Sequence, residues 1–82
     1  MVKTHEISIK GSTAWQQFTN NNYMIINKSD INIQDYILFK NVETIDAETV
    51  QETGLYRMTQ VIDIVEHEGL KEGYVLVVLN KM

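Results

Sequence analysis

The sequence predicts a small α+β domain, a mixed β-barrel of about five or six strands with one helix after the first strand. Three observations support this prediction. Most segments either alternate polar and apolar residues or form short β-branched runs, a single early segment has helical spacing, and glycines and asparagines separate these segments. With 82 residues, the chain can build one hydrophobic core. We therefore expect a single domain over residues 1–82.

The first predicted strand covers residues 4–9, where apolar and polar side chains alternate as in a half-buried strand. His5, Ile7 and Ile9 share its expected inner face. We expect His5 to be a satisfied barrel residue, with its ring hydrogen-bonded to the backbone. Gly11 then ends the strand.

A short helix is expected next. Thr13 and Gln16 have the spacing of a capping box, and the apolar residues up to Phe18 can share one side of the helix. The asparagines at 20–22 are expected to stop it, because asparagine tolerates the left-handed backbone found at helix ends. Residues 23–26 form a short apolar run, which predicts a strand buried on both faces.

The rest of the chain is predicted to be mostly β-structure. Residues 27–30 indicate a turn, and residues 36–42 a strand. Residues 43–54 are acidic and weakly patterned, so we expect a loop, either irregular throughout or with one helical turn around residues 47–50. Residues 55–66 predict a long β-branched strand, and residues 74–79 a closing central strand.

Composition excludes several kinds of protein. The chain has no cysteine, so it can form neither a disulfide nor a thiolate metal site, which fits a reducing cytoplasm. Its N-terminal residues lack the apolar core of a secretory signal. Its longest apolar run is far shorter than the roughly 20 residues of a membrane-spanning helix. We therefore expect a cytoplasmic protein with no membrane partner.

The charge distribution limits the partners further. The net charge is −4, which argues against a general nucleic-acid binder. Residues 1–40 hold four lysines against three acidic residues, whereas residues 41–82 hold three basic against eight acidic residues. Any contact with a polyanion is therefore expected on the first half of the chain.

The order of segments resembles a known family. The matching segments, in chain order, are THEISIK at 4–10, the helix with Phe18, the turn at 28–30, QDYIL at 34–38, Thr53-Gly54, and GLKEGYV at 69–75. This order resembles the activating signal cointegrator homology (ASCH) family of the PUA-like β-barrel superfamily. Within it, the chain looks closest to a branch of small bacterial and phage proteins. The resemblance covers nearly the whole chain.

The resemblance implies a PUA-like barrel with a cleft between the first helix and the neighbouring strands. Members of the superfamily commonly bind RNA or recognise a modified base or nucleoside, and some ASCH members are small nucleoside amidohydrolases. The family signature is Gly-x-Lys-x-x-Glu-x-Arg, and its defined positions hold Asn20, Asn22, Ile25 and Asn27 here. The usual Gly-Asp turn is Gln34-Asp35. Every charged group of the signature is absent, so we do not expect an activity that depends on it.

The first functional hypothesis is a binding module whose cleft accepts RNA, a nucleotide or a modified nucleoside. Amide side chains present hydrogen-bond donors and acceptors together, which suits recognition of a base edge, and the basic side chains could hold a phosphate. The candidate ligand-binding residues are Lys10, Asn22, Asn27, Lys28 and Arg57.

Two other hypotheses remain. The chain could be a degenerate ASCH domain that acts through protein contacts, as a homodimer or with a regulatory partner. A hydrolase built from Lys10, Ser12 or Thr13, and Asp30 is less expected, and we assign no catalytic residue. His5 and His67 are too far apart in the chain, in different kinds of element, to indicate a metal site, so no cofactor is expected.

Overall fold

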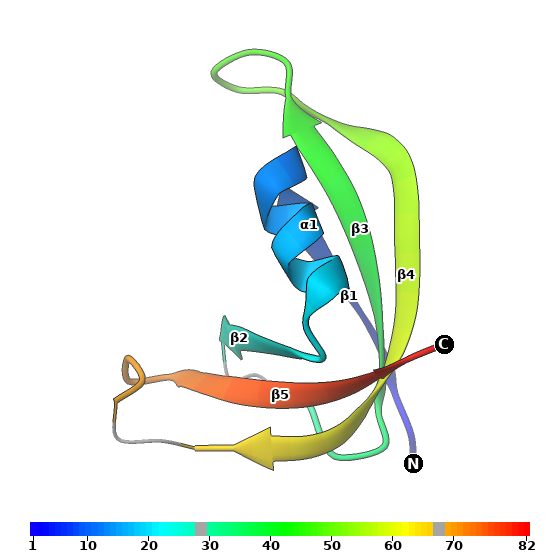
Figure 1. Ribbon diagram of the computed structural model, residues 1–82, viewed down its shortest axis with the longest axis vertical. Helices are drawn as coiled ribbons and strands as arrows, with labels where there is room; N and C mark the ends of the chain where they lie inside the picture. The colour runs from blue at the N-terminus through cyan, green and yellow to red at the C-terminus, as the bar shows by residue number, and fades with distance from the viewer. Residues whose placement is uncertain (28–29, 67–68) are drawn as a thin grey trace.

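The computed structural model describes residues 1–27, 30–66 and 69–82, and it contains one helix and a five-stranded mixed sheet (Figure 1). This confirms the α+β class and the position of the helix after the first strand. The elements in chain order are β1 (Thr4–Lys10), α1 (Ser12–Asn20), β2 (Tyr23–Asn27), β3 (Tyr36–Thr44), β4 (Val50–Val65) and β5 (Tyr74–Lys81).

The sheet has the strand order β1-β3-β4-β5-β2. β1 and β3 are parallel, and the other three pairs are antiparallel. β1 and β2 are therefore the two edges, and no backbone pairing joins them in the described part of the chain. The expected closure into a barrel is not confirmed, and the sheet stays open between these edges.

β4 is a long, bent strand that curves the sheet. Its residues up to Gln60 pair with β3, whereas those from Thr59 onward pair with β5, and the strand bends between the two partners (Figure 1). The register with β5 shifts between Val61 and Asp63, which marks a bulge. Because bulges increase local twist and bend a strand, this irregularity helps to curl the sheet.

The acidic segment at 43–54 is not the loop that the sequence suggested. β3 continues to Thr44 and β4 begins at Val50, so most of the segment is a hairpin. The Asp46 carboxylate accepts the backbone N–H groups of Glu48 and Thr49, both at 2.9 Å. This aspartate turn acts together with the backbone bond from the Ile45 N–H to the Thr49 carbonyl at 3.0 Å. The two close the tip, and the strands extend further than their weak hydrophobic pattern indicates.

α1 covers the inner face of the curved sheet (Figure 1). Phe18 is 2% exposed, and its ring centroid lies 4.5 Å from that of Phe39 on β3. The buried hydrophobic cluster around this pair consists of Ile9, Ile26, Ile37, Val61, Val75, Val77 and Leu79. Every strand contributes to this cluster, so the helix and all five strands share one core.

The start of α1 differs from the prediction. The helix begins at Ser12 with Gly11 in the capping position, and no side chain caps it. The expected capping box of Thr13 and Gln16 is therefore wrong, because Thr13 already lies inside the first turn. Gly11 has φ 92°, a backbone conformation that glycine adopts readily.

The end of α1 lies where the asparagines predicted it, at Asn20. Asn21, however, is extended rather than left-handed. Its side-chain Nδ2 donates to the Gln17 oxygen at 2.7 Å. The last strand also contributes, because the Lys81 ammonium donates to the Phe18 and Thr19 oxygens at 2.6 and 2.8 Å, and also to the Asn21 oxygen. Desolvation there lowers the pKa of Lys81.

β2 is not buried on both faces, as its apolar run suggested. Tyr23 and Ile25 are each 50% exposed, and Ile26 is the one fully buried residue of the strand. The prediction is wrong because β2 is an edge strand that pairs only with β5. In the described ranges, no helix combines the length and apolar character that crossing a membrane requires.

Candidate functional site

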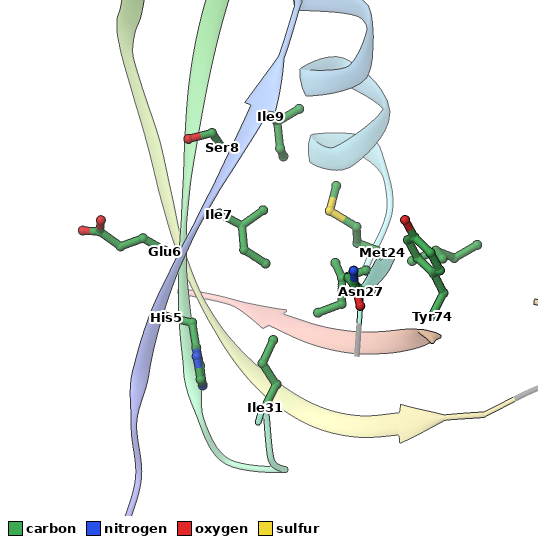
Figure 2. Close-up of a pocket in the computed structure, with 11 residues that line it drawn as sticks. His5, Glu6, Ile7, Ser8, Ile9, Met24, Asn27, Ile31 and Tyr74 are labelled. Atoms are coloured by element: carbon green, nitrogen blue, oxygen red, sulfur yellow. The ribbon is translucent and has the colours of Figure 1, made fainter. Parts of the chain in front are cut away.

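A cleft of about 780 Å³ lies in the gap between the edges of β1 and β2 (Figure 2). It is lined by His5, Glu6, Ile7, Ser8, Ile9, Met24, Ile25, Ile26, Asn27, Ile31 and Tyr74. A second hollow of about 420 Å³ lies between α1 and β2 and shares Met24 and Ile25 with the first. The cleft that the family resemblance implied, beside the first helix, matches the smaller hollow; the larger one lies between two strands.

The walls of the larger cleft are strand edges. Five consecutive residues of β1 and four of β2 line it, although neighbouring side chains in a strand point to opposite faces. Such an unbroken run is expected when the backbone itself faces the space. β1 pairs only with β3, and β2 only with β5, so each presents one edge to the cleft that no described strand covers.

The side chains that fill the interior are mainly apolar. Figure 2 shows Ile7 and Ile9 pointing from β1 toward the side of Met24, whereas Glu6 and Ser8 point the other way. The Glu6 carboxylate lies 3.5 Å from the Lys40 ammonium, outside the cleft. Among the described residues, the polar side chains left for a ligand are therefore those of His5, Asn27 and Tyr74.

Asn27 and Tyr74 line the β2 side of the cleft together, because they are paired across β2 and β5 (Figure 2). They lie on the strand face that alternates with Met24 and Ile26. Asn27 is exposed, and Tyr74 is partly buried. The Lys71 ammonium lies 5.6 Å from the centroid of the Tyr74 ring, a cation–π distance. This wall combines an amide with an aromatic ring, the two kinds of group that bind a flat heterocycle.

His5 is held by Asp35, just before β3. Its Nε2 lies 2.8 Å from Asp35 Oδ2, and the backbone N–H groups of Lys3 and Asn32 donate to the same carboxylate at 3.1 and 3.0 Å. The ring is thus satisfied, as expected, but by a carboxylate and not by the backbone. The hydrogen bond from His5, followed by those from Lys3 and Asn32, lowers the pKa of Asp35 to about 2.

Asp35 is fixed in place by the chain on both sides of it. It is 2% exposed, and its carbonyl accepts the N–H of Val61 at 2.8 Å. Gln34 precedes it with φ 79°, in the left-handed region that favours glycine. Glycine is the residue that the ASCH resemblance places at this position.

Of the five residues expected to bind a ligand, the structure places Asn27 in the cleft. Lys10 is exposed at the far end of β1, and Arg57 is exposed on β4. Asn22 is exposed before β2, where its carbonyl accepts the N–H of Leu79 at 2.7 Å. Lys10, Asn22 and Arg57 therefore do not line this cleft, and their role in ligand binding stays a prediction. Lys28, like His67, lies outside the described residues.

The hydrolase set is not assembled either. Asp30 is bonded at 2.9 Å to Lys3, just before the start of β1, whereas Lys10 ends that strand. A strand rises about 3.3 Å per residue, so the seven residues of β1 keep Lys10 far from Asp30. No group of three histidine, aspartate or glutamate side chains able to hold a metal ion gathers among the residues that the structure describes.

His5, Asp35 and Tyr74 were not among the predicted site residues. His5 carried a signal, since it is a titratable side chain on an otherwise apolar strand face. Asp35 carried another, as the aspartate of the Gln34-Asp35 pair that was compared with a Gly-Asp turn in the ASCH resemblance. Their contact was not predictable, because it depends on the parallel pairing of β1 with β3.

Comparisons with protein-family models and with curated proteins find no match for this chain.

Proposed function

We propose that the chain is a small binding module whose β1–β2 cleft takes a nucleobase or a modified nucleoside. The observation that carries this proposal is the lining: an apolar interior with His5 on the β1 side, and Asn27 with Tyr74 on the β2 side. Ligand sites are typically concave spaces of about 300–1,000 Å³, mainly apolar and with few polar groups that fix orientation. The cleft has this size and this character.

The lining favours a single base over a nucleic-acid strand. A strand would require a track of lysine or arginine side chains for its phosphates. Lys10 and Arg57 lie elsewhere, and no basic side chain lines the cleft in the part of the chain that is described. The net charge of −4 also opposes a polyanion. We therefore narrow the RNA-or-nucleoside hypothesis to a small ligand without a phosphate backbone.

The ASCH resemblance supports the same ligand class, since PUA-like proteins commonly recognise bases. In this proposal the open sheet is a PUA-like barrel with a gap between β1 and β2, and the ligand occupies the gap. The missing signature charges argue for binding rather than for amidohydrolase activity.

The test is calorimetric titration of the protein with purine and pyrimidine nucleosides, in wild type and in Asn27→Ala. Asn27 is exposed, so its truncation should leave the fold intact, and loss of one or two hydrogen bonds should weaken binding roughly three- to tenfold. Asn22→Ala is the matched control, because it makes the same chemical change outside the cleft. Equal weakening in both variants, or no binding of any nucleoside, would contradict the proposal.

A second candidate function has its own observation. The edges of β1 and β2 that no described strand pairs with could accept an extended peptide that adds a strand to the sheet, as in β-augmentation. This is the form that the protein-contact hypothesis takes here, with a second copy or another protein as the source of the strand. Sedimentation at rising concentration tests for self-association; a dimer that forms while all nucleosides fail to bind would favour this candidate.

A further inference from the structure

The tautomer of His5 follows from its contact with Asp35. A carboxyl whose pKa lies at about 2 is ionised at neutral pH and can only accept hydrogen bonds. The ring nitrogen facing it, Nε2, must therefore carry the proton and donate it across 2.8 Å. In a neutral imidazole the other nitrogen, Nδ1, then has a free lone pair.

Nδ1 is also reachable. No hydrogen bond to this atom is found within the described residues, and no side-chain nitrogen or oxygen that is buried there lacks a partner. Nδ1 must therefore be in contact with solvent. His5 lines the cleft, and its ring lies beside Ile31 on the side of β1 that Ile7 also faces (Figure 2).

The other two polar side chains of the lining do not have a fixed role. An asparagine amide offers donors and an acceptor, and a tyrosine hydroxyl can do either. Asn27 and Tyr74 can therefore bind a ligand that presents a hydrogen-bond donor or one that presents an acceptor. His5 cannot, since exchanging its tautomer would leave the Asp35 carboxylate without its closest donor.

We infer that His5 is the residue that determines specificity in the cleft, and that Asp35 makes it a hydrogen-bond acceptor, so that the preferred ligand presents an N–H donor such as an exocyclic amino group. This inference rests on the proposed function. A base that places an N–H donor against His5 Nδ1 gains a hydrogen bond. A base that places an acceptor there leaves the Nδ1 lone pair without a donor.

The test compares adenosine with purine riboside, which differs only by lacking the amino group, at a mildly alkaline pH. Wild type should bind adenosine roughly three- to tenfold more tightly. In His5→Phe, which keeps an aromatic ring of similar width and removes the acceptor, the two affinities should become equal. Asn27→Ala should weaken both ligands and keep the preference.

A second measurement needs no variant. At the same mildly alkaline pH, nitrogen-15 chemical shifts of the neutral His5 ring report which nitrogen carries the proton. The proton should lie on Nε2, which faces Asp35, and the Nδ1 signal should shift when adenosine binds. Equal binding of both ligands to wild type, or a proton on Nδ1, would overturn the inference and leave the proposed function standing. Failure of both nucleosides to bind would overturn the two together.

Discussion

The two ends of β1 are each held by a buried polar side chain from the neighbourhood of β3, and the two ends are built in opposite ways. At the start of the strand, Asp35 is an acceptor that gathers N–H groups. At its end, Asn41 is chiefly a donor: its Nδ2 donates to the carbonyls of Ile9 and Gly11 at 3.1 and 3.0 Å. Asp35 is 2% exposed and Asn41 4%.

The two ends differ in whether a hydrogen-bonding group remains available to a ligand. Around Asn41 the network is closed, because the Thr53 hydroxyl donates to Asn41 Oδ1 at 2.8 Å. Around Asp35 the network ends at the His5 imidazole, whose Nδ1 has no hydrogen-bond partner among the described residues. Two equally buried side chains therefore have different roles. Asn41 only fixes the end of β1, whereas Asp35 fixes its start and also orients the His5 ring toward a ligand.

Replacing Asp35 by alanine should have the largest effect. It removes a charged acceptor from two backbone N–H groups and from the His5 ring, and hydrogen bonds to charged groups are the stronger kind. We expect a larger fall in melting temperature than in any other variant discussed, together with loss of the adenosine preference. Differential scanning fluorimetry measures the first and calorimetric titration the second.

The pH dependence of this effect has a definite sign. Folding lowers the pKa of Asp35 from 3.8 to about 2, so its stabilising contribution is complete above 3.8 and is lost as the pH falls through about 2. The gap in melting temperature between wild type and Asp35→Ala should narrow over this range. A gap that stays constant into acid would show that the carboxylate charge does not stabilise the fold.

Asn41→Ala should come next. It removes a donor from the buried Ile9 carbonyl, at a cost of about 1–3 kcal/mol in the free energy of unfolding. The partly buried Gly11 carbonyl also loses a donor but still accepts the N–H of Trp15 at 3.3 Å. Nucleoside affinity of the folded fraction should not change, since Asn41 does not line the cleft. Urea unfolding measures the stability. A loss of binding equal to that of Asp35→Ala would erase the distinction between the two ends.

Gln34→Gly should have the smallest effect, with the opposite sign. A non-glycine residue at φ 79° carries backbone strain of about 1–2 kcal/mol, and glycine's greater freedom in the unfolded chain offsets about half of that. We expect a gain of about 1 kcal/mol or less, again by urea unfolding. Destabilisation would show that the Gln34 side chain supports Asp35 more than its backbone strains it.

Local pattern predicted most of the fold. The alternation at residues 4–9 gave β1 and its inner face, and the asparagines gave the end of α1. The errors came from features that pattern does not encode. The apolar run at 23–26 cannot show that β2 is an edge strand. The acidic composition of 43–54 does not indicate the hairpin whose turn Asp46 stabilises.

The candidate site was less predictable than the fold. Asn27 could be chosen for its amide, but Lys10, Asn22 and Arg57 were grouped by chemistry and by family position alone. The site depends on which strands lie at the sheet edges, and that is decided by non-local pairing. His5 and Asp35 are 30 positions apart, and nothing near either residue in the chain indicates their contact.

The contact of Lys81 with the end of α1 has a consequence for the order of folding. It joins atoms 63 positions apart, and β2 likewise pairs with the distant β5. An isolated helix of nine residues is unstable in water, so α1 depends on these partners. Loop-closure entropy disfavours such contacts until the sheet has formed. The helix end and β2 are thus expected to dock late on the folding pathway, which makes the cleft one of the last features to form and one of the first to open.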